Sequence, residues 1–238
     1  MLERLELLVG KNKIDLIKNK KILLVGLGGV GGACFEALVR SGFNNLTIID
    51  NDCFESSNLN RQLLSNISNI GSKKVLEAVK RAKMINPDIF INSYEMFLNE
   101  ANIDELNIFN YDYVIDACDT VTTKVLLIKE CIKYNVKIIS SMGTGNRVDP
   151  TKLVITNIWK TSYDPLAKAV RKLLREAHID NNINVLVSLE QPVKVSGDTV
   201  GSSCFVPNAA GFCIASCVFN DIINMRVWLL WKIVKENI

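Results

Sequence analysis

The sequence feature that most constrains the fold is a short apolar run that leads directly into closely spaced glycines. Residues 21–25 read KILLV and residues 26–32 read GLGGVGG. A strand that continues through such glycines into a helix is typical of a nucleotide-binding turn, because backbone without Cβ atoms can approach phosphate and a helix N-terminus favours anions. A tight strand-to-helix turn without a ligand would also fit this pattern.

The residues after the glycines narrow the choice of nucleotide. A second apolar run, residues 46–49, ends at Asp50, at the spacing of an acid that binds ribose hydroxyls. A surface or helix-capping acid is the alternative. Residues 57–62 then read SNLNRQ. Polar side chains and an arginine there leave little room for nicotinamide, but they suit an enzyme that transfers adenylate to a carboxylate, because charge builds on the α-phosphate during attack.

The order of the expected elements predicts an α/β fold with a Rossmann-like, doubly wound, mostly parallel sheet. Beyond residue 151 the pattern becomes less regular, which predicts an irregular C-terminal extension of strands and helices. We expect one domain over residues 1–238, with a nucleotide-binding half at 1–150 and a substrate-binding and dimer-facing half at 151–238. The expected strands are 21–26, 45–50, 89–94, 112–116, 136–141, 153–158 and 185–189, and the expected helices are 30–42, 72–86, 122–134, 165–177 and 208–234.

The composition places the chain among globular proteins of the cytoplasm. Of the 238 residues, 48% are hydrophobic and 22% are charged, as in soluble domains. Charged residues occur throughout residues 1–21, which is unlike a signal peptide. No run is apolar for 18 residues, so no membrane span is expected. The seven cysteines form no C-x-x-C pair, so we expect reduced thiols and no zinc site. The loop residue Cys204 could be reactive.

Several motifs resemble the ubiquitin-activating-enzyme-like superfamily. The resemblance lies in residues 26–31, Asp50, Asp52, residues 57–62 and the sequence DACD at 116–119. Two further stretches are similar to its tRNA threonylcarbamoyladenosine dehydratase branch. They are GTGNRVDPT at 143–151 and KTSYDPLA at 160–167, which is followed by two arginines.

This resemblance implies an ATP site and a reaction. Arg61, Lys74 and Asp119 would be catalytic, Asp119 would hold Mg²⁺, and Arg4 would reach the site of the partner subunit in a homodimer. The superfamily pattern favours Lys74 over Lys73, although either could be a solvated helix-start lysine. The remaining expected nucleotide ligands are Gly26, Gly28, Gly29, Gly31, Asp50, Asp52, Asn58, Asn60 and Gln62.

A cluster of basic residues lies in the second half of the chain. On a helix from residue 165, positions 168, 171, 172 and 175 share one face. A solvated helix face is the ordinary interpretation, and the net charge of +3 neither requires nor excludes nucleic acid. The resemblance favours a contact with tRNA, whose phosphates need neutralising. The expected tRNA-binding residues are Lys160, Lys168, Arg171, Lys172 and Arg175.

The resemblance implies that the substrate is tRNA carrying N6-threonylcarbamoyladenosine (t6A). Its carboxylate would be adenylated by ATP, and ring closure would expel AMP. Two alternatives remain at this point: an adenylyltransferase for a ubiquitin-like sulfur carrier, and a non-catalytic dinucleotide-binding scaffold. A monovalent cation and a sulfur-relay protein partner are also possible. The apolar segment 208–234 could pack in the core, face a dimer partner or touch a membrane.

Overall fold

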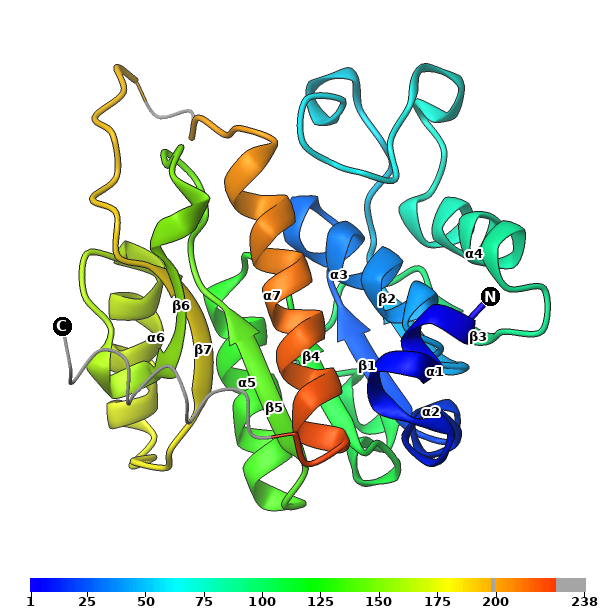
Figure 1. Cartoon of the computed structure of the whole chain (residues 1–238). Helices are drawn as coiled ribbons and strands as arrows, with labels where there is room; N and C mark the ends of the chain where they lie inside the picture. Colours follow the sequence, from blue (N-terminus) through cyan, green and yellow to red (C-terminus); the bar gives the residue numbers. More distant parts are fainter. Residues whose placement is uncertain (198–199, 226–238) are drawn as a thin grey trace, which may run out of the picture.

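The computed structural model describes residues 1–197 and 200–225, and in this part of the chain helices cover both faces of one sheet (Figure 1). The helices are α1 (Glu3–Val9), α2 (Lys11–Lys18), α3 (Gly29–Arg40), α4 (Lys74–Ile85), α5 (Val121–Lys133), α6 (Pro165–Glu176) and α7 (Phe205–Ile222). The strands are β1 (Lys21–Val25), β2 (Asn45–Ile49), β3 (Phe90–Tyr94), β4 (Tyr113–Asp116), β5 (Lys137–Ser141), β6 (Leu153–Asn157) and β7 (Asn184–Ser188).

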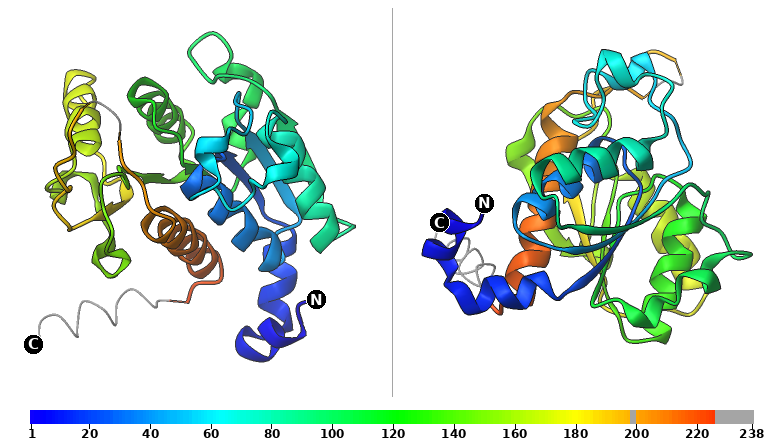
Figure 2. Two further views of the ribbon diagram at one scale, coloured as in Figure 1. Left: turned by 90° about the horizontal axis from the view of Figure 1, so that it is seen from above. Right: turned by 90° about the vertical axis from the view of Figure 1, so that its right-hand side faces the viewer.

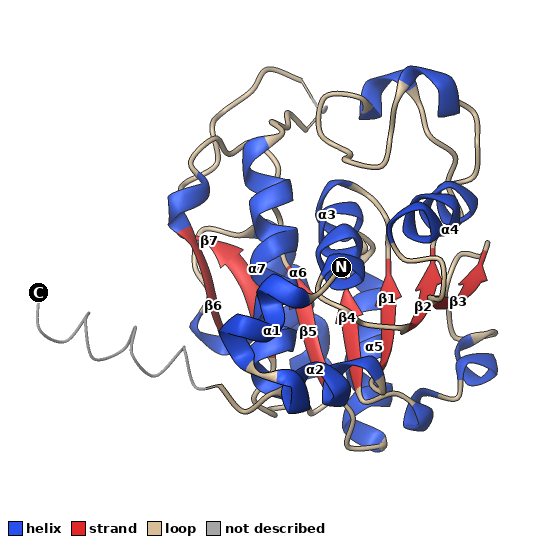
Figure 3. Cartoon of the chain, turned by 45° about the vertical axis from the view of Figure 1, so that its right-hand side comes forward, coloured by secondary structure: helices blue, strands red, loops and turns tan. Residues whose placement is uncertain are grey.

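The strands form one seven-stranded sheet in the order β3-β2-β1-β4-β5-β7-β6 (Figure 3). All neighbours are parallel except β6, which runs antiparallel to β7. The chain moves outward from β1 in one direction to β2 and β3 and in the other to β4 and β5. This switch point opens a crevice at the carboxyl ends of the strands, where such sheets bind ligands. The predicted α/β fold is confirmed, and β6 and β7 extend the same sheet.

The central strands are buried on both faces, which explains why β1 reads as a continuous apolar run. Ile22 and Leu24 face a core shared with α3 and α7, whereas Leu23 and Val25 face a second core shared with α5. Figure 2 shows α7 and α5 on opposite faces of the sheet. Both layers therefore hold the end of β1 rigidly, and with it the glycine turn that follows.

The last described helix, α7, lies against α3 on one face of the sheet. At Gly211 a Cβ atom would collide with the backbone of α3, so the two helices approach closely. The predicted helix over 208–234 is wrong in its extent, because the helix ends at Ile222 and Asn224 has a left-handed φ of 53°. The part from 226 to 234 lies outside the described residues. By length and composition alone α7 could cross a membrane, and half of it is buried inside the protein.

Candidate active site

A cavity of about 740 Å³ lies at the carboxyl ends of the parallel strands. Residues that follow β1, β2, β4 and β5 line it, together with residues at the start of α6 and residues before and at the start of α7. Its wall therefore joins the nucleotide fingerprint to segments more than 100 residues away in the sequence. Ten of the sequence-predicted site residues line this cavity, namely Gly26, Gly28, Gly29, Asp50, Asp52, Asn58, Arg61, Gln62, Lys74 and Asp119.

The glycines of the turn serve two different purposes. Gly26 has a φ of 92°, and a Cβ atom there would lie 2.7 Å from the carbonyl oxygen of Ala117. At Gly31, which is not a lining residue, a Cβ atom would collide with the carbonyl of Gly26. Gly26 thus lets the turn pack against the loop after β4, and Gly31 lets α3 pack closely on the turn. Gly28 has open space where its Cβ would lie, so a ligand could approach its backbone.

Asp50 follows β2 and links the glycine turn to the next loop. Its Oδ2 accepts a hydrogen bond from the Leu27 N–H at 2.6 Å, and its Oδ1 accepts one from the Asp52 N–H at 2.8 Å. Burial raises the pKa of this carboxyl, and the nearby Lys74 opposes that shift. Each carboxylate oxygen retains a second lone pair, so ribose hydroxyls could still donate to Asp50.

Lys74 begins α4 and reaches into the cavity. Its Nζ lies 2.8 Å from Asp52 Oδ2 and 3.9 Å from Asp50 Oδ1, and the residue is 5% exposed. Lys73 does not reach into the cavity. Its Nζ instead pairs with Glu95 at 2.6 Å, and neither residue lines the cavity. A buried ammonium held by two carboxylates is a compact charge on which phosphate oxygens could bind.

The segment from residue 55 to 62 forms the outer wall of the cavity. Arg61 Nη1 donates to the Ser57 carbonyl at 2.8 Å and to Asn60 Oδ1 at 3.0 Å, which fixes the guanidinium at the cavity. Gln62 is 7% exposed, and its buried Oε1 has no hydrogen-bond partner within the described part of the chain. A buried amide oxygen is costly to leave unpaired, so Gln62 is suited to a ligand that donates.

Two predicted ligands in this segment have local partners. Asn58 accepts from the Glu55 N–H at 3.1 Å and caps the short helix Ser56–Asn58, while still touching the cavity. Asn60 donates to the Ser202 carbonyl at 2.9 Å and does not line the cavity, so its contact with a nucleotide stays a prediction. Asparagine side chains bind nearby backbone groups as readily as ligands.

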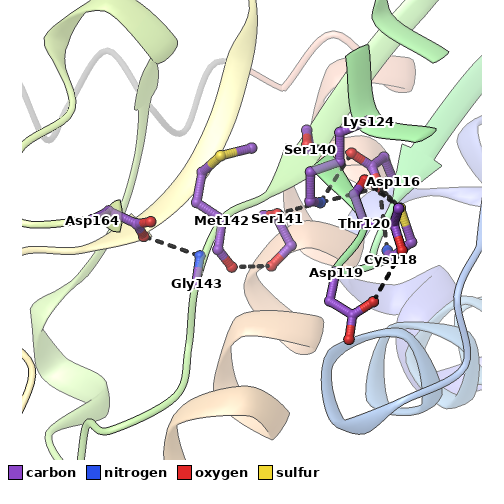
Figure 4. Close-up of polar contacts among 10 residues, drawn as sticks. All are labelled: Asp116, Cys118, Asp119, Thr120, Lys124, Ser140, Ser141, Met142, Gly143 and Asp164. Carbon is purple, nitrogen blue, oxygen red and sulfur yellow. Dashed lines mark hydrogen bonds and ion pairs between the residues drawn. The ribbon is translucent and has the colours of Figure 1, made fainter. Parts of the chain in front are cut away.

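Asp116 belongs to a buried polar cluster below the cavity (Figure 4). Lys124 Nζ lies 3.1 Å from Asp116 Oδ2, and both side chains are fully buried. Lys124 also donates to the Ser141 carbonyl at 2.7 Å, and Ser140 Oγ donates to Asp116. The Cys118 N–H donates to Asp116 Oδ1 at 3.2 Å. The cluster thus fixes the turn after β4, and sequence reasoning missed Lys124.

Asp119 lies on that same turn but faces outward. It is exposed, lines the cavity, and accepts only a long contact of 3.5 Å from Thr120 Oγ1 within the described residues. In Figure 4 its carboxylate points away from the Asp116–Lys124 pair. Proteins that bind nucleotides usually hold Mg²⁺ with one or two carboxylates, phosphate oxygens and water. A free carboxylate at the cavity such as that of Asp119 could serve as one of these ligands.

A second buried ion pair shapes the opposite wall. Arg147 is 2% exposed, its Nη2 lies 3.6 Å from Asp164 Oδ2, and it donates to the carbonyls of Gly143 and Tyr163. Asp164 caps α6 and accepts from the Gly143 N–H at 3.0 Å. This pair holds the Gly143–Gly145 loop against the start of α6. Both residues lie in the motifs that the sequence singled out, but no role was predicted for them.

The predicted basic residues do not all present free charges. Lys160, Lys168, Lys172 and Arg175 are exposed, and the Arg175 guanidinium lies 5.5 Å from the centre of the Trp159 ring. Arg171 is half-buried, because its Nη1 donates to the carbonyls of Ile158 and Thr161. Arg171 therefore holds the loop before α6, and the other four residues form the exposed basic face.

Arg4 is exposed on α1 and does not line the cavity of its own chain. Helix α1 buries none of its residues and stands away from the sheet (Figure 2). The two leucines Leu7 and Leu8 on it are 85% and 74% exposed. An action of Arg4 on a site would therefore require a second copy of the chain.

Comparison with known proteins adds to this geometry. A tRNA threonylcarbamoyladenosine dehydratase of Bacillus subtilis is 37% identical, with 93% of this chain and 94% of that protein covered. The crystal structure of the Escherichia coli tRNA N6-threonylcarbamoyladenosine dehydratase in complex with AMP superposes with a TM-score of 0.88, at 30% identity and 92% coverage of both chains. The structure of the same enzyme in complex with ATP gives a TM-score of 0.87.

The family assignment rests on the extent of the match. Residues 2–189 match the ThiF family, and this stretch contains all of the predicted site residues. The resemblance predicted from the motifs is confirmed, and the chain belongs to the ThiF family.

Proposed function

We propose that this protein is an ATP-dependent tRNA threonylcarbamoyladenosine dehydratase. The observation that carries the proposal is a single cavity. Its lining includes Gly28 and Asp50, which would bind the nucleotide, together with the Gly143–Gly145 loop and Leu166. ATP and a second small group could therefore meet in the same space. The extent of similarity to dehydratases of Bacillus subtilis and Escherichia coli supports the same substrate class.

The reaction has two steps. The t6A carboxylate attacks the α-phosphate of ATP, which forms an acyl-adenylate and releases pyrophosphate. An intramolecular nucleophile of the modified base then attacks the activated carbonyl, closes a ring and expels AMP, so the substrate loses one water. Arg61 and Lys74 would stabilise charge on the phosphates, and Asp50 would orient the ribose. Tethering makes ring closure effectively unimolecular, so it needs no protein nucleophile.

The direct test uses purified protein, ATP and tRNA that carries t6A. Nucleoside mass spectrometry should show conversion of t6A to its dehydrated cyclic form with stoichiometric AMP and pyrophosphate. Pyrophosphate exchange into ATP that depends on a ubiquitin-like sulfur carrier and not on tRNA would favour the carrier adenylyltransferase instead. Absence of exchange with both substrates would favour a non-catalytic nucleotide-binding scaffold.

Lys74 should contribute to ATP affinity, and Lys73 should not. Replacing Lys74 by methionine removes a buried ammonium beside the cavity, and we expect ATP affinity to fall by about tenfold to a hundredfold, as for a lost charge-assisted hydrogen bond. Lys73→Met is the matched control, because it removes the same charge one residue away. Isothermal titration with ATP and NAD checks both points. Equal losses in the two variants, or a preference for NAD, would contradict the proposed phosphate site.

Asp119 is the residue that we propose to hold Mg²⁺. The ion would be held jointly by this carboxylate and by phosphate oxygens, since the described residues contain no group of three or more side chains that could hold a metal alone. When bound, Mg²⁺ neutralises charge that develops on the phosphates. A monovalent cation remains a further possible requirement, to be tested by exchanging the salt.

The protein should act as a homodimer in which Arg4 completes the neighbouring site. The exposed apolar residues of α1 support this proposal. Arg4→Ala and Asp119→Ala should each be inactive alone, and mixing them should restore up to about a quarter of wild-type activity by random pairing, since only the mixed dimer has one intact site. Light scattering and activity assays check this prediction. A monomer at assay concentration, or absence of rescue, would contradict it.

The exposed basic face should bind tRNA and should leave ATP binding unchanged. Each phosphate contact releases counterions, so removing one contact should lower the slope of log affinity against log salt by about 1. Lys168→Gln and Lys172→Gln should therefore lower it by about 2 together. Arg171 is left intact, because it holds the loop. Lys80→Gln with Lys83→Gln on α4 is the charge-matched control. An unchanged slope would return this face to ordinary solvated surface.

The remaining proposals concern the setting of the enzyme. We place it in the cytoplasm, where its tRNA substrate occurs, with the exposed Cys204 and the other free thiols reduced. Residues 1–150 would mainly bind nucleotide, and residues 151–238 would mainly bind tRNA and the partner subunit. A sulfur-relay protein is a possible further partner, which affinity purification followed by mass spectrometry would test.

A further inference from the structure

Tyr163 combines an exposed aromatic ring with an unfavourable backbone conformation. Its φ is 56°, in the left-handed region that favours glycine, and the residue is 58% exposed. Burial of the ring therefore does not stabilise this conformation. A bulky residue keeps such a backbone only where surrounding contacts impose it, and residues of this kind gather at functional sites.

The contacts that impose the conformation also hold a segment that lines the cavity. Arg147 donates from Nη2 to the Tyr163 carbonyl at 3.1 Å, and the same guanidinium donates to the Gly143 carbonyl. The next residue, Asp164, is 5% exposed and accepts from the Gly143 N–H. Arg171 holds the Thr161 carbonyl on the other side at 3.2 Å. The Tyr163 backbone is thus tied through Arg147 to Gly143, which lines the cavity, although Tyr163 itself does not.

The surroundings of the ring indicate the chemistry of its partner. Exposed lysines lie on either side in the chain, at Lys160 and Lys168. An exposed aromatic ring on a segment that also carries exposed lysines fits an unpaired nucleotide, whose base stacks while its phosphates meet the cations. The fixed backbone is an advantage for such a contact, because little conformational entropy remains to be lost on binding.

We propose that Tyr163 is a stacking platform for an unpaired nucleobase of the tRNA anticodon loop, next to the modified adenosine. The inference rests on the proposed function, because that function brings an anticodon loop to this cavity. It adds a recognition element that is aromatic rather than cationic. Stacking is tolerant of base identity, so Tyr163 would recognise the open loop conformation rather than one sequence.

The test uses variants that separate the ring from the backbone. Tyr163→Gly removes the ring and suits the positive φ, so its melting temperature should equal or exceed that of the wild type. Tyr163→Leu keeps apolar bulk without a π face, and Tyr163→Phe keeps the face. His178→Gly is the control for the effect of glycine on the backbone. His178 also has a positive φ, of 55°, and follows the C-terminal end of α6. The probe is a synthetic anticodon stem-loop RNA that carries t6A, measured by fluorescence anisotropy.

We expect Tyr163→Gly and Tyr163→Leu to weaken RNA binding by roughly 5-fold to 150-fold, with ATP affinity unchanged. Tyr163→Phe and His178→Gly should bind within about twofold of the wild type. If the wild type modifies the tRNA but Tyr163→Gly and Tyr163→Leu bind the stem-loop as well as it does, the stacking inference fails alone. If the wild type neither binds nor modifies t6A-containing RNA, the proposed function fails and the inference with it.

Discussion

Replacement of Asp119 by asparagine should lower the rate of adenylation by on the order of 10²-fold to 10³-fold, the range for loss of one preorganised electrostatic contact. Asparagine keeps the shape of the side chain but loses the negative charge that would hold Mg²⁺. Because Asp119 is exposed and makes only one long contact among the described residues, the fold should not change. Pyrophosphate release with t6A-containing tRNA, measured across a range of Mg²⁺ concentrations, checks this expectation.

The metal dependence distinguishes this role from a general loss of activity. If Asp119 holds the ion, the variant should need more Mg²⁺ for half-maximal rate, and tRNA affinity should match that of the wild type. Asp104→Asn is the control, since Asp104 is an exposed acid outside the cavity. Turnover close to wild type in Asp119→Asn would remove this residue from the proposed metal site.

Replacement of Lys124 by methionine should lower the free energy of unfolding by about 3–5 kcal/mol, the cost of breaking a buried ion pair. Asp116 would stay fully buried without its ammonium partner, and the Ser141 carbonyl would lose a donor. Total stability is usually only about 5–15 kcal/mol, so this loss should be visible as a large shift in the urea midpoint. Equilibrium urea denaturation followed by circular dichroism is the measurement.

A double-mutant cycle identifies the origin of the effect. Asp116→Asn combined with Lys124→Met removes both charges, and the pair should be less destabilised than the sum of the two single variants. Lys129→Met, an exposed lysine on the same helix α5, should change stability by no more than about 0.5 kcal/mol. Additive losses in the cycle would mean that Lys124 stabilises the fold through its hydrogen bond to the Ser141 carbonyl and not through the ion pair.

The same cluster connects stability to the active site. The Cys118 N–H is held by Asp116, and Asp119 follows one residue later. Lys124→Arg should therefore retain more adenylation activity than Lys124→Met, because a guanidinium can still pair with Asp116, although its different shape strains the buried site.

Much of the nucleotide half could be predicted from local pattern. The apolar run 21–25, the glycines and Asp50 are contiguous signals, and each reflects a constraint that acts over a few residues. Strands buried on both faces must be apolar throughout, and a close helix packing on the turn excludes a Cβ atom at Gly31. The alternation of strands and helices then determined the parallel sheet and the edge at which a ligand binds.

Other residues had no such local signature. Lys124 and Arg147 look like ordinary charged residues in the sequence, yet each is fully or almost fully buried against a carboxylate. Lys124 meets Asp116 because α5 folds back over β4. Arg147 meets Asp164 because the chain returns to the same place after forming β6. Conversely, the side chains of Asn60 and Arg171, which the sequence predicts to bind ligands, donate to backbone carbonyls in the folded chain.

The fold class, the position of the nucleotide turn and the family could be predicted from the sequence, because they depend on spacing and on residue size along a continuous stretch. Which polar side chains face the cavity and which hold its walls became apparent only in the folded chain. Charged and amide side chains are long and can bind backbone, carboxylate or ligand with similar energies. The partner that such a side chain binds therefore depends on which groups the folded chain brings within about 3 Å of it.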